Sequence, residues 1–397
     1  MRVAALLATV SLLSFGGMPA FAETQEQYGD SHADLTLNVD HAGSVTGSSV
    51  AGSNSYTSTA DGASVVLPGY QYSEGDSSAS SSATVWSAHG DVVIFGDSAG
   101  NTTTVDVRNG DIGIGHNQYM TGDSSASVNV QTGDSGGAYS SASASGNVTS
   151  VASENGSVET GVIQESGGAV SANVEADHCC VGWTASGDAV ASGNSIATTG
   201  STSTIYGYSE QYSHGPDVNA RVDLYAGYAG DAVGAAAASG NTMSIDNQWG
   251  YVNATAVQHN WSDATAESYV TLGGDFLGVA SASSYGVGNA ANVSNVGSDT
   301  VMNVAQTNEG AIGSFAAVSG QGGDYAVASA VGYGNVVTGG LCTTCNDAGV
   351  PSLNAQSAQT NHGSVYSSAN VVTAGARHVA GSAVAIGNAA SYNVSGN

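Results

Sequence analysis

Apolar and polar positions alternate along almost the whole chain, in short runs that small polar residues interrupt. In the run 112–120, Ile112, Ile114 and Met120 share one parity, and Gly or polar residues fill most of the other positions. Clusters of Asn, Thr, Gly and Asp bound this run on both sides, at 109–111 and 121–123. Period-two alternation between such clusters predicts β-strands joined by turns.

The same pattern returns at a fixed period. Between Asn101 and Gly146 it predicts about four short strands, at 102–107, 112–120, 126–130 and 139–145. The Ala run 235–238 favours helix by propensity, but it occupies a strand position of the repeat, so we expect a strand there. We therefore predict an all-β β-solenoid of about eight 47-residue units.

Two series of amide residues mark the period. The asparagines, most of them in Gly-Asn pairs, are Asn54, Asn101, Asn147, Asn194, Asn241, Asn289, Asn335 and Asn388, at steps of 47, 46, 47, 47, 48, 46 and 53 residues. The glutamines are Gln71, Gln118, Gln164, Gln211, Gln258, Gln306 and Gln359; all but the last follow their asparagine by 17 residues. In a stacked solenoid, equivalent amides hydrogen-bond along the axis, which offsets the cost of burying them. Both ladders are therefore expected to be scaffold.

The domain boundaries follow from the repeats. Residues 1–22 are predicted to be a signal peptide, because Arg2 precedes an apolar run that ends at an Ala20-Phe21-Ala22 cleavage pattern. Residues 23–53 form a partial repeat or cap, residues 54–387 hold the units that start at 54, 101, 147, 194, 241, 289 and 335, and residues 388–397 are a truncated repeat. The mature chain is thus expected to be exported, and to be soluble or peripherally attached to a membrane.

Two coil geometries fit a 47-residue unit. Each unit could form one wide coil, or two coils of about 23 or 24 residues, and we expect two because small inward side chains suit a thin core. At ~4.8 Å between strands, two coils per unit would give a rod of roughly 75 Å, and one coil about half of that. The pattern does not fix the handedness of the coil.

The charge balance excludes some partners. The chain has 32 acidic residues, four Arg and no Lys, for a net charge of -28. Nucleic acid and anionic lipid both require clustered cations, so neither is expected as a partner. After residue 22 no run approaches the ~20 apolar residues of a transmembrane helix.

Catalysis and metal binding find little support in the sequence. Several acids beside Gly are expected in Asx-turns: Asp76, Asp123, Asp188, Asp231, Asp275 and Asp324. The nine His residues share no consistent repeat position, and neither a His-Glu-x-x-His motif nor a P-loop is present. We therefore expect no enzyme activity and no cofactor; Ca²⁺ held by rows of turn carboxylates is a weaker alternative.

The tyrosines and cysteines leave alternatives open. Tyr206, Tyr208, Tyr212 and Tyr225 are candidate sugar contacts, or ordinary cross-strand pairs. Cys342 and Cys345 lie in the insertion that widens the last repeat, where a disulfide would close a loop. The adjacent Cys179 and Cys180 could pair with each other, pair with another chain, or stay reduced.

The repeats resemble two known families. Segments such as 304–308 and 357–361 resemble curlin repeats, although the unit here is about twice as long. The intact Ala-Ser-Gly-Asn motif at 144–147, 191–194 and 238–241 resembles more closely the holdfast attachment protein D family. That resemblance implies a non-enzymatic surface protein that anchors an adhesive exopolysaccharide, the holdfast. It also implies a curlin-like anchor subunit and an outer-membrane lipoprotein similar to the curli export channel as partners.

Two other functions remain open. The chain could be a self-associating, curli-like amyloid or biofilm-matrix fibre subunit, since solenoid ends permit stacking. A polysaccharide-processing β-helix enzyme is the third alternative.

Overall fold

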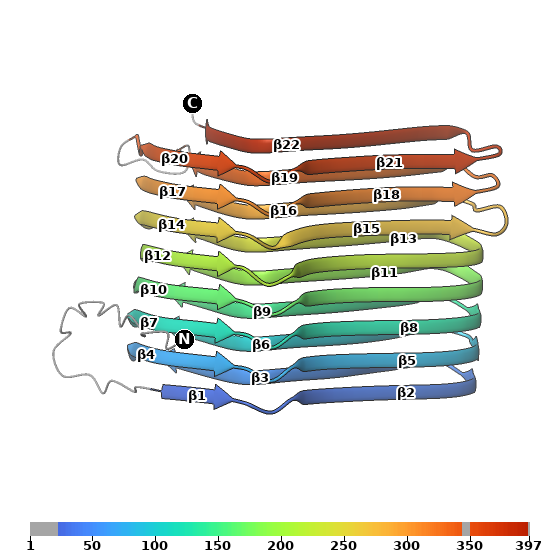
Figure 1. Ribbon diagram of the computed structural model, residues 1–397, viewed down its shortest axis with the longest axis horizontal. Coiled ribbons are helices and arrows are strands. Elements are labelled where there is room, and N and C mark those ends of the chain that lie inside the picture. Colours follow the sequence, from blue (N-terminus) through green and yellow to red (C-terminus); the bar gives the residue numbers. More distant parts are fainter. Residues whose placement is uncertain (1–22, 344–349, 396–397) are drawn as a thin grey trace.

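The chain folds as a β-solenoid. The computed structural model describes residues 23–343 and 350–395, which form eight coils of parallel strands (Figure 1). The predicted signal peptide lies outside these residues. Each coil supplies one strand to each of three stacks, which we name A, B and C.

Short strands build stack A. They are β1 (Glu23–Gln27), β4 (Val65–Ser73), β7 (Ile112–Met120), β10 (Ser157–Ser166), β12 (Thr204–Ser213), β14 (Val252–Asn260), β17 (Thr300–Asn308) and β20 (Leu353–Asn361). Stack B follows in each coil. Its strands are β2 (Ser31–Ala42), β5 (Ser77–Ala88), β8 (Ser124–Ser135), the first parts of β11 (Val170–Ser201) and β13 (Asp217–Gln248), β15 (Asp263–Leu272), β18 (Ile312–Gly320) and β21 (Val365–Thr373).

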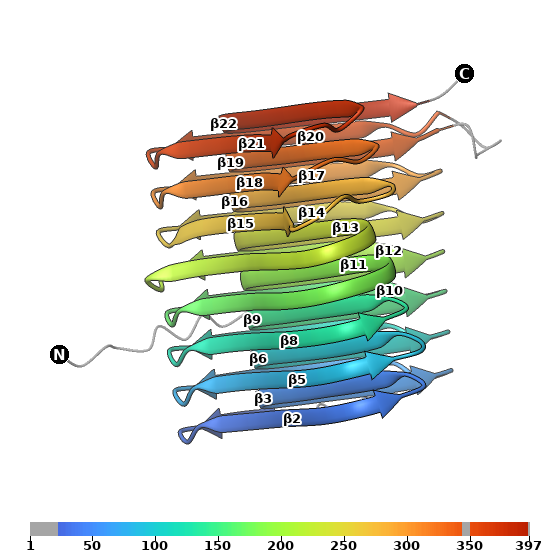
Figure 2. The same ribbon diagram turned by 90° about the vertical axis from the view of Figure 1, so that its right-hand side faces the viewer.

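Stack C contains the longest strands. They are β3 (Val45–Asp61), β6 (Val92–Arg108), β9 (Ala138–Glu154), the second parts of β11 and β13, β16 (Val279–Val296), β19 (Tyr325–Cys342) and β22 (His378–Ser395). In the middle coils, β11 and β13 run from stack B into stack C around the corner that faces the viewer in Figure 2. We name this edge the B–C corner.

The coil has two layers. Stacks A and B lie side by side in one layer, and stack C forms the opposite layer (Figure 1). One apolar cluster joins stack B to the first halves of the C strands, and a second joins stack A to their second halves. Both consist mainly of Ala, Val and Ile, which suits closely spaced layers.

A Gly-Asn pair divides each C strand into these halves. Buried residues alternate up to Ala144, and then Gly146 and Asn147 are both buried, so the alternation changes parity. A Cβ atom at Gly146 would lie 2.4 Å from the carbonyl oxygen of Gly193 in the next coil, so this approach requires glycine. The change of parity lets one continuous strand face stack B and then stack A.

The register shows one coil per unit. Gln118 pairs with Gln71 and Gln164, its counterparts one unit away on either side. The preference for two coils per unit was therefore wrong, and eight coils at ~4.8 Å give a rod of roughly 38 Å. Two half-size coils would have stacked each asparagine on a residue 23 or 24 positions further on, such as Ser124 on Asn101, whereas a single coil stacks identical residues on one another.

The four predicted segments are all strands. The run 112–120 is β7, and 126–130 lies within β8. Segments 102–107 and 139–145 are the second and first halves of two successive C strands, β6 and β9. A unit counted from one Gly-Asn pair to the next thus cuts a C strand in two. The Ala run 235–238 is strand, within β13.

The asparagines form an unbroken ladder of side-chain hydrogen bonds. Each Nδ2 donates to Oδ1 of the asparagine in the following coil, over 2.7–2.8 Å, from Asn54 through to Asn388. The same Nδ2 atoms donate a second bond to a stack A carbonyl: Asn147, for example, reaches the oxygen of Glu165 over 2.8 Å. The ladder therefore ties stack C to stack A as well as coil to coil.

The glutamine ladder runs beside it in the opposite direction. Each Nε2 donates to Oε1 of the preceding coil, over 2.7–2.9 Å, from Gln359 back to Gln71 and on to Gln25. A second bond goes to stack C, as from Gln164 to the carbonyl of Ser195 over 3.0 Å. The ladder residues lie at the kink of C and near the end of A, so they separate the two apolar clusters.

A shorter third ladder was not predicted. Asn260 donates to Asn308 over 2.7 Å, and Asn308 donates to Asn361 over 2.8 Å. In earlier coils Ser166 and Ser213 occupy this position. Because the amide is present only in the later coils, it gives no period along the whole sequence.

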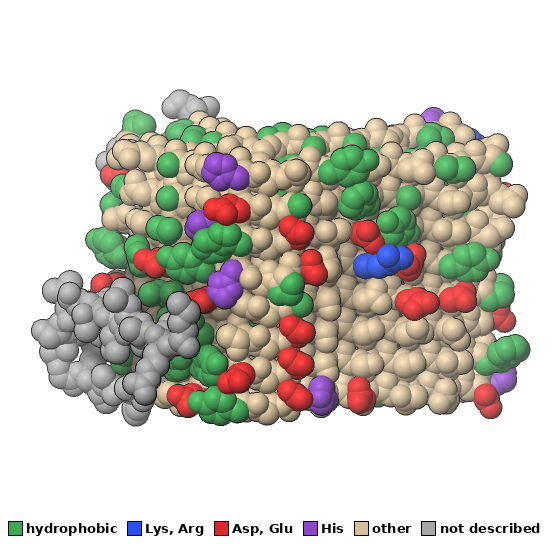
Figure 3. Space-filling model, viewed as in Figure 1, with side chains coloured by type: hydrophobic (Ala, Val, Ile, Leu, Met, Phe, Trp, Pro, Cys, Tyr) green, Lys and Arg blue, Asp and Glu red, His purple; other side chains and the backbone are tan. Residues whose placement is uncertain are grey.

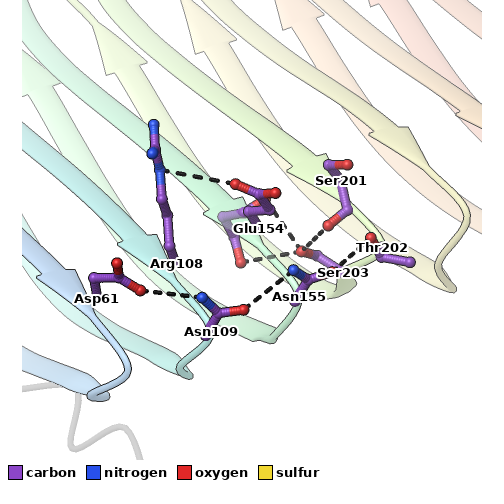
Figure 4. Close-up of polar contacts among 9 residues, drawn as sticks. Asp61, Arg108, Asn109, Glu154, Asn155, Ser201, Thr202 and Ser203 are labelled. Carbon is purple, nitrogen blue, oxygen red and sulfur yellow. Dashed lines mark hydrogen bonds and ion pairs between the residues drawn. The ribbon is translucent and has the colours of Figure 1, made fainter.

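The turn between stacks C and A carries a polar row on the surface. Asn109, Asn155 and Thr202 occupy it with φ values of 53°, 57° and 55°. Their side chains bond from coil to coil, Asn109 to Asp61 over 3.0 Å, Asn155 to Asn109 over 3.2 Å and Thr202 to Asn155 over 2.9 Å (Figure 4). Asn tolerates this left-handed conformation better than Thr, so among these three residues the backbone conformation is least favourable at Thr202.

Removing one amide from the asparagine ladder should destabilise the solenoid. In Asn194→Ala, Asn147 loses its acceptor, and Asn241 Oδ1 and the Tyr212 carbonyl lose their donor, all in a buried region. We expect a loss of about 2–4 kcal/mol in the free energy of unfolding, measured by chemical denaturation. The matched control is Asn173→Ala on the same strand, β11, whose side chain points outward; it should change stability by less than about 0.5 kcal/mol. Equal effects of the two variants would contradict a structural role of the ladder.

Candidate functional site

The outward face of stack A differs from the rest of the surface. On β12, alternate side chains point away from the core, and Tyr206 and Tyr208 are 49% and 41% exposed. Tyr212, on the same strand and the same side, is half-buried. Three of the four candidate sugar contacts therefore lie together. Tyr225 lies apart on β13, near the B–C corner.

Aromatic rings continue from this strand into the neighbouring coils. Tyr28 pairs with Tyr72 (ring centroids 5.9 Å apart), Tyr70 with Tyr119 (5.6 Å) and Tyr206 with Tyr251 (5.8 Å). Trp261 stacks against Tyr212 at 6.4 Å and against His259 at 3.5 Å. We name this set the aromatic band: Tyr28, Tyr70, Tyr72, Tyr119, Tyr206, Tyr208, Tyr212, Tyr251, His259 and Trp261.

Part of the band could have been read from the sequence. The residue after each ladder glutamine points outward, and at that position stand Tyr72, Tyr119, Glu165, Tyr212 and His259. The sequence reasoning used the glutamines only as interior markers and missed the column beside them. Trp261 carries no periodic signal, because His214 and Glu309 follow the corresponding strands in the adjacent coils.

Carboxylates are interspersed among the rings. Glu210 accepts hydrogen bonds from the hydroxyls of Tyr208 and Tyr212, the latter over 3.0 Å. The hydrogen bond from Tyr208 to Glu210 is the main cause that raises the pKa of Tyr208 to about 12. Burial is the main cause that raises the pKa of Tyr212 to about 12. Both phenols therefore remain protonated donors at neutral pH.

Further carboxylates extend this arrangement. Glu165 lies 2.6 Å from Nε2 of His214, and Tyr28 donates to Glu26 over 2.8 Å. The described strands of stack A contain no Lys or Arg. Figure 3 shows hydrophobic, acidic and histidine side chains gathered over the stack A strands, beside a mostly tan surface over stack B that carries scattered acidic side chains and a basic one.

The band passes into a shallow polar depression toward the C-terminal coils. Thr255, Asn303 and Gln356 occupy the positions that correspond to Tyr208 and line an open hollow of about 280 Å³. Rings, carboxylates and amides thus share one flat, extended surface. Such a surface suits a long polar polymer better than a small molecule, which needs an enclosed pocket.

Comparison with known proteins identifies the family. The family model of holdfast attachment protein D matches residues 21–313, which span the first six coils and the start of the seventh. The chain belongs to the holdfast attachment protein D family. No curated protein and no solved structure gave a significant match. Membership indicates a holdfast attachment protein of the cell surface.

In this family member the predicted ladder residues are interior and leave the surface to other side chains. Seven of the eight asparagines and six of the seven glutamines are buried, and those of the last coil are partly or fully exposed. They are available to hold coils together. They are not available to bind a ligand along the face of the rod.

The turn acids mostly serve the backbone. Asp76 and Asp123 accept N–H groups from the following coil over 2.9 and 2.8 Å, and Asp231 does so over 2.7 Å. Asp188 and Asp231 were expected in turns, but they lie within the long strands β11 and β13, because the chain rounds the B–C corner there without a break.

Within the described residues, no three His, Cys, Asp or Glu side chains lie close enough to hold a metal ion. None of the described segments forms a helix that meets the length and apolarity of a membrane span.

The cysteines lie away from the aromatic band. The Sγ atoms of Cys179 and Cys180 are 2.7 Å apart on the outer side of the B–C corner. The hydrogen bond with Cys179 is the largest cause that raises the pKa of Cys180 to about 11. Cys345 lies outside the described residues, so the disulfide with Cys342 stays a prediction.

Two histidines are buried in the core. His116 lies 3.1 Å from both Thr103 and Gln71, and His178 Nδ1 lies 2.9 Å from Thr132 Oγ1, while its Nε2 has no hydrogen-bond partner in the described part of the chain. Burial lowers the pKa of each to about 4 from the ordinary value of 6.5. Both imidazoles are therefore neutral in the folded protein at neutral pH.

These histidines should make the solenoid sensitive to acid. Between pH 6.5 and about 4 the unfolded chain binds protons that the folded chain does not, so stability falls as the pH is lowered through this window. We expect His178→Val, which introduces the residue of the equivalent position Val85, to abolish about 3 kcal/mol of that pH dependence. Denaturation at a series of pH values measures it. His89→Ser, at an exposed turn, should leave the slope unchanged, and an unchanged slope in His178→Val would show that His178 titrates normally.

Proposed function

We propose that this protein is a non-enzymatic anchor whose aromatic band holds the holdfast polysaccharide at the cell envelope. The observation that carries the proposal is the band itself, rings and hydrogen-bonding groups exposed together on one face of a rigid rod. Sugar rings stack on exposed aromatic side chains through their C–H faces, and their hydroxyls bond to phenols and carboxylates.

The solenoid repeats this surface along its axis. Coils follow one another at ~4.8 Å, which is close to the length of one hexose in a polymer. A polysaccharide lying along the band would meet several weak contacts in series, and linked weak contacts give tight, slowly released binding. An anchor needs such retention and needs no chemical step. From the resemblance to this family we further propose a curlin-like subunit and a lipoprotein similar to the curli export channel as partners in the envelope.

Removing the rings should release the polysaccharide without stopping its synthesis. We expect Tyr206→Asn with Tyr208→Thr, which introduce the residues of the next coil, Asn253 and Thr255, to reduce surface attachment of cells at least tenfold. Polysaccharide should appear in the medium, detected with a lectin, while the amount of protein at the surface stays constant. The control is Trp86→Ser with Trp183→Ser, since these side chains are 73% exposed on the B–C side of the rod, away from stack A.

Two results would contradict the proposal. One is normal attachment by the tyrosine variant. The other is the loss of polysaccharide synthesis, instead of shedding, when the whole protein is deleted.

The two ends of the solenoid favour a second function, self-assembly into fibres. The last coil, β20–β22, has no described coil above it, and most of its residues are at least partly exposed. Among the described residues, Asn388 accepts a bond from Asn335 and its Nδ2 donates none, while Asn54 donates to Asn101 and its Oδ1 accepts none. The unpaired donor at one end matches the unpaired acceptor at the other. Head-to-tail stacking would therefore continue the ladder, and such contacts do not close into a ring.

A charge placed on the last asparagine of the ladder tests this assembly. Asn388→Asp keeps the acceptor for Asn335 but replaces the outer donor with a carboxylate, so we expect it to prevent end-to-end growth and leave the monomer folded. Sedimentation and amyloid-dye binding over several days would compare it with the unaltered protein. Asn370→Asp, on the outward side of β21, is the control and should assemble normally. Unaltered protein that stays monomeric would contradict the fibre function.

A further inference from the structure

We propose that Cys179 and Cys180 form a reversible disulfide with each other, which makes the B–C corner of the fourth coil a site of thiol–disulfide exchange. The pair is oxidised by small disulfide compounds and is reduced again by small thiols. This site lies away from the aromatic band, and the inference does not depend on what the band binds.

The B–C corner places two consecutive side chains on the outer surface. Along a flat strand successive side chains point to opposite faces, so adjacent cysteines would point apart. Here His178 is buried, Cys179 is exposed, Cys180 is partly exposed and Val181 is buried again. The path of the coil sets this order, because it recurs in the neighbouring coils. There the two outer positions hold Gly133 and Asp134, and Gly227 and Tyr228.

The two thiols are in contact. Their Sγ atoms are 2.7 Å apart. The pairing of β11 with β13 shifts register directly after them, between Val181 and Thr184, so the chain departs from a regular strand at this point. A group held beside its reaction partner in the same chain reacts much faster than with a group on another molecule. The contact therefore favours a bond within the pair over a cross-link to a second chain.

Small molecules in solution can reach the pair. Cys179 is flanked by Gly133 and Gly227 in the neighbouring coils, and neither residue has a side chain that could cover its sulfur. Cys180 is less exposed. Cys179 is therefore the sulfur that an external disulfide meets first.

Oxidation of the pair takes two exchange steps. The thiolate of Cys179 attacks one sulfur of the external disulfide, which forms a mixed disulfide and releases one thiol. The sulfur of Cys180 then attacks Cys179, which closes the bond within the pair and releases the second thiol. The pair loses two electrons and two protons, and the external disulfide takes them up as two thiols.

The order of the two steps follows from the state of Cys180. The hydrogen bond with Cys179 is the main cause that raises the pKa of Cys180 to about 11, so this thiol keeps its proton at neutral pH. Because the thiolate is the nucleophile in exchange, a protonated and less exposed thiol is poorly suited to the first attack. Cys180 acts second, on a sulfur that already lies beside it.

Adjacency makes the bond reversible. Disulfides usually join residues whose Cα atoms are about 4.4–6.8 Å apart, whereas consecutive Cα atoms are about 3.8 Å apart. A bond between neighbours is therefore strained, and strained, exposed disulfides are reduced more readily than structural ones. It also closes almost no loop, so it constrains the unfolded chain little. Cell-surface proteins meet oxidising conditions, in which the pair becomes oxidised.

Alkylation and mass spectrometry of the purified full chain test the inference. The protein is isolated from the cell surface with all free thiols blocked and is then digested. We expect the peptide that contains both cysteines to lack two hydrogen atoms and to carry no alkyl group. Reduced glutathione added to the folded protein should open the bond, and oxidised glutathione should close it. The alkylated fraction should follow the ratio of the two forms of glutathione.

Single variants separate the roles of the two sulfurs. Cys180→Ser should accumulate a mixed disulfide between glutathione and Cys179, because the second step lacks its nucleophile. Cys179→Ser should react with oxidised glutathione at least about tenfold more slowly, since Cys180 is less exposed and holds its proton. Both variants should keep the thermal unfolding midpoint of the unaltered chain, which shows that the difference in rate does not come from unfolding.

Three results would overturn the inference. The first is a peptide with two alkylated cysteines that oxidised glutathione does not join. The second is a disulfide from either cysteine to another chain. The third is a bond within the pair that reduced glutathione cannot open in the folded protein. Equal reaction rates of the two single variants would overturn the assignment of Cys179 as the attacking sulfur.

Discussion

The coil depends on satisfying amides that have no access to water. A wide, thin coil of Ala, Ser and Val buries little apolar volume per residue, so interior polar groups must contribute cohesion. Each ladder glutamine, and each ladder asparagine up to Asn335, bonds both to its counterpart in the adjacent coil and to a backbone carbonyl of the facing stack, as Asn147 and Gln164 do. One side chain thus fixes the distance between coils and the distance between layers. Loss of either bond leaves a buried polar group unpaired, which costs about 1–3 kcal/mol.

This constraint explains why the interior positions of the repeat stay the same from coil to coil while the outward positions vary. Positions that stack on themselves must carry the same amide in every coil, as Gln118 and Gln164 do. The neighbouring outward positions are free to differ, and Tyr119 faces Glu165 in the next coil. The repeat therefore presents a regular scaffold with an irregular surface. The irregular part contains the rings and carboxylates from which a binding role can be argued.

The interior could be predicted from the sequence because stacking forces identity at a fixed spacing. The Asn and Gln series, the strand at 112–120 and the strand over the Ala run 235–238 all follow from that spacing. The number of coils per unit was predicted wrongly. The change of parity at Gly146-Asn147 fuses two segments into one long strand, and a search for short strands does not detect it. The third ladder at Asn260, Asn308 and Asn361 was missed because earlier coils hold serine or methionine at that position.

The surface was less accessible to such reasoning. Tyr206, Tyr208 and Tyr212 were singled out as a cluster, but Tyr225 belongs to another stack, since the chain turns away from stack A before reaching it. Trp261 joins the band through a turn whose residue changes from coil to coil. Proximity of this kind depends on the path of the coil and appears only in three dimensions.

The opposed directions of the two amide ladders have an electrostatic consequence for the length of the rod. In an α-helix all peptide dipoles point the same way and leave partial charges at the ends. Here seven asparagine bonds point toward one end and seven glutamine bonds toward the other, so their dipoles cancel along the axis. A coil added by duplication of the repeat would bring opposed amide dipoles, so these two ladders build up no net axial dipole as the rod lengthens.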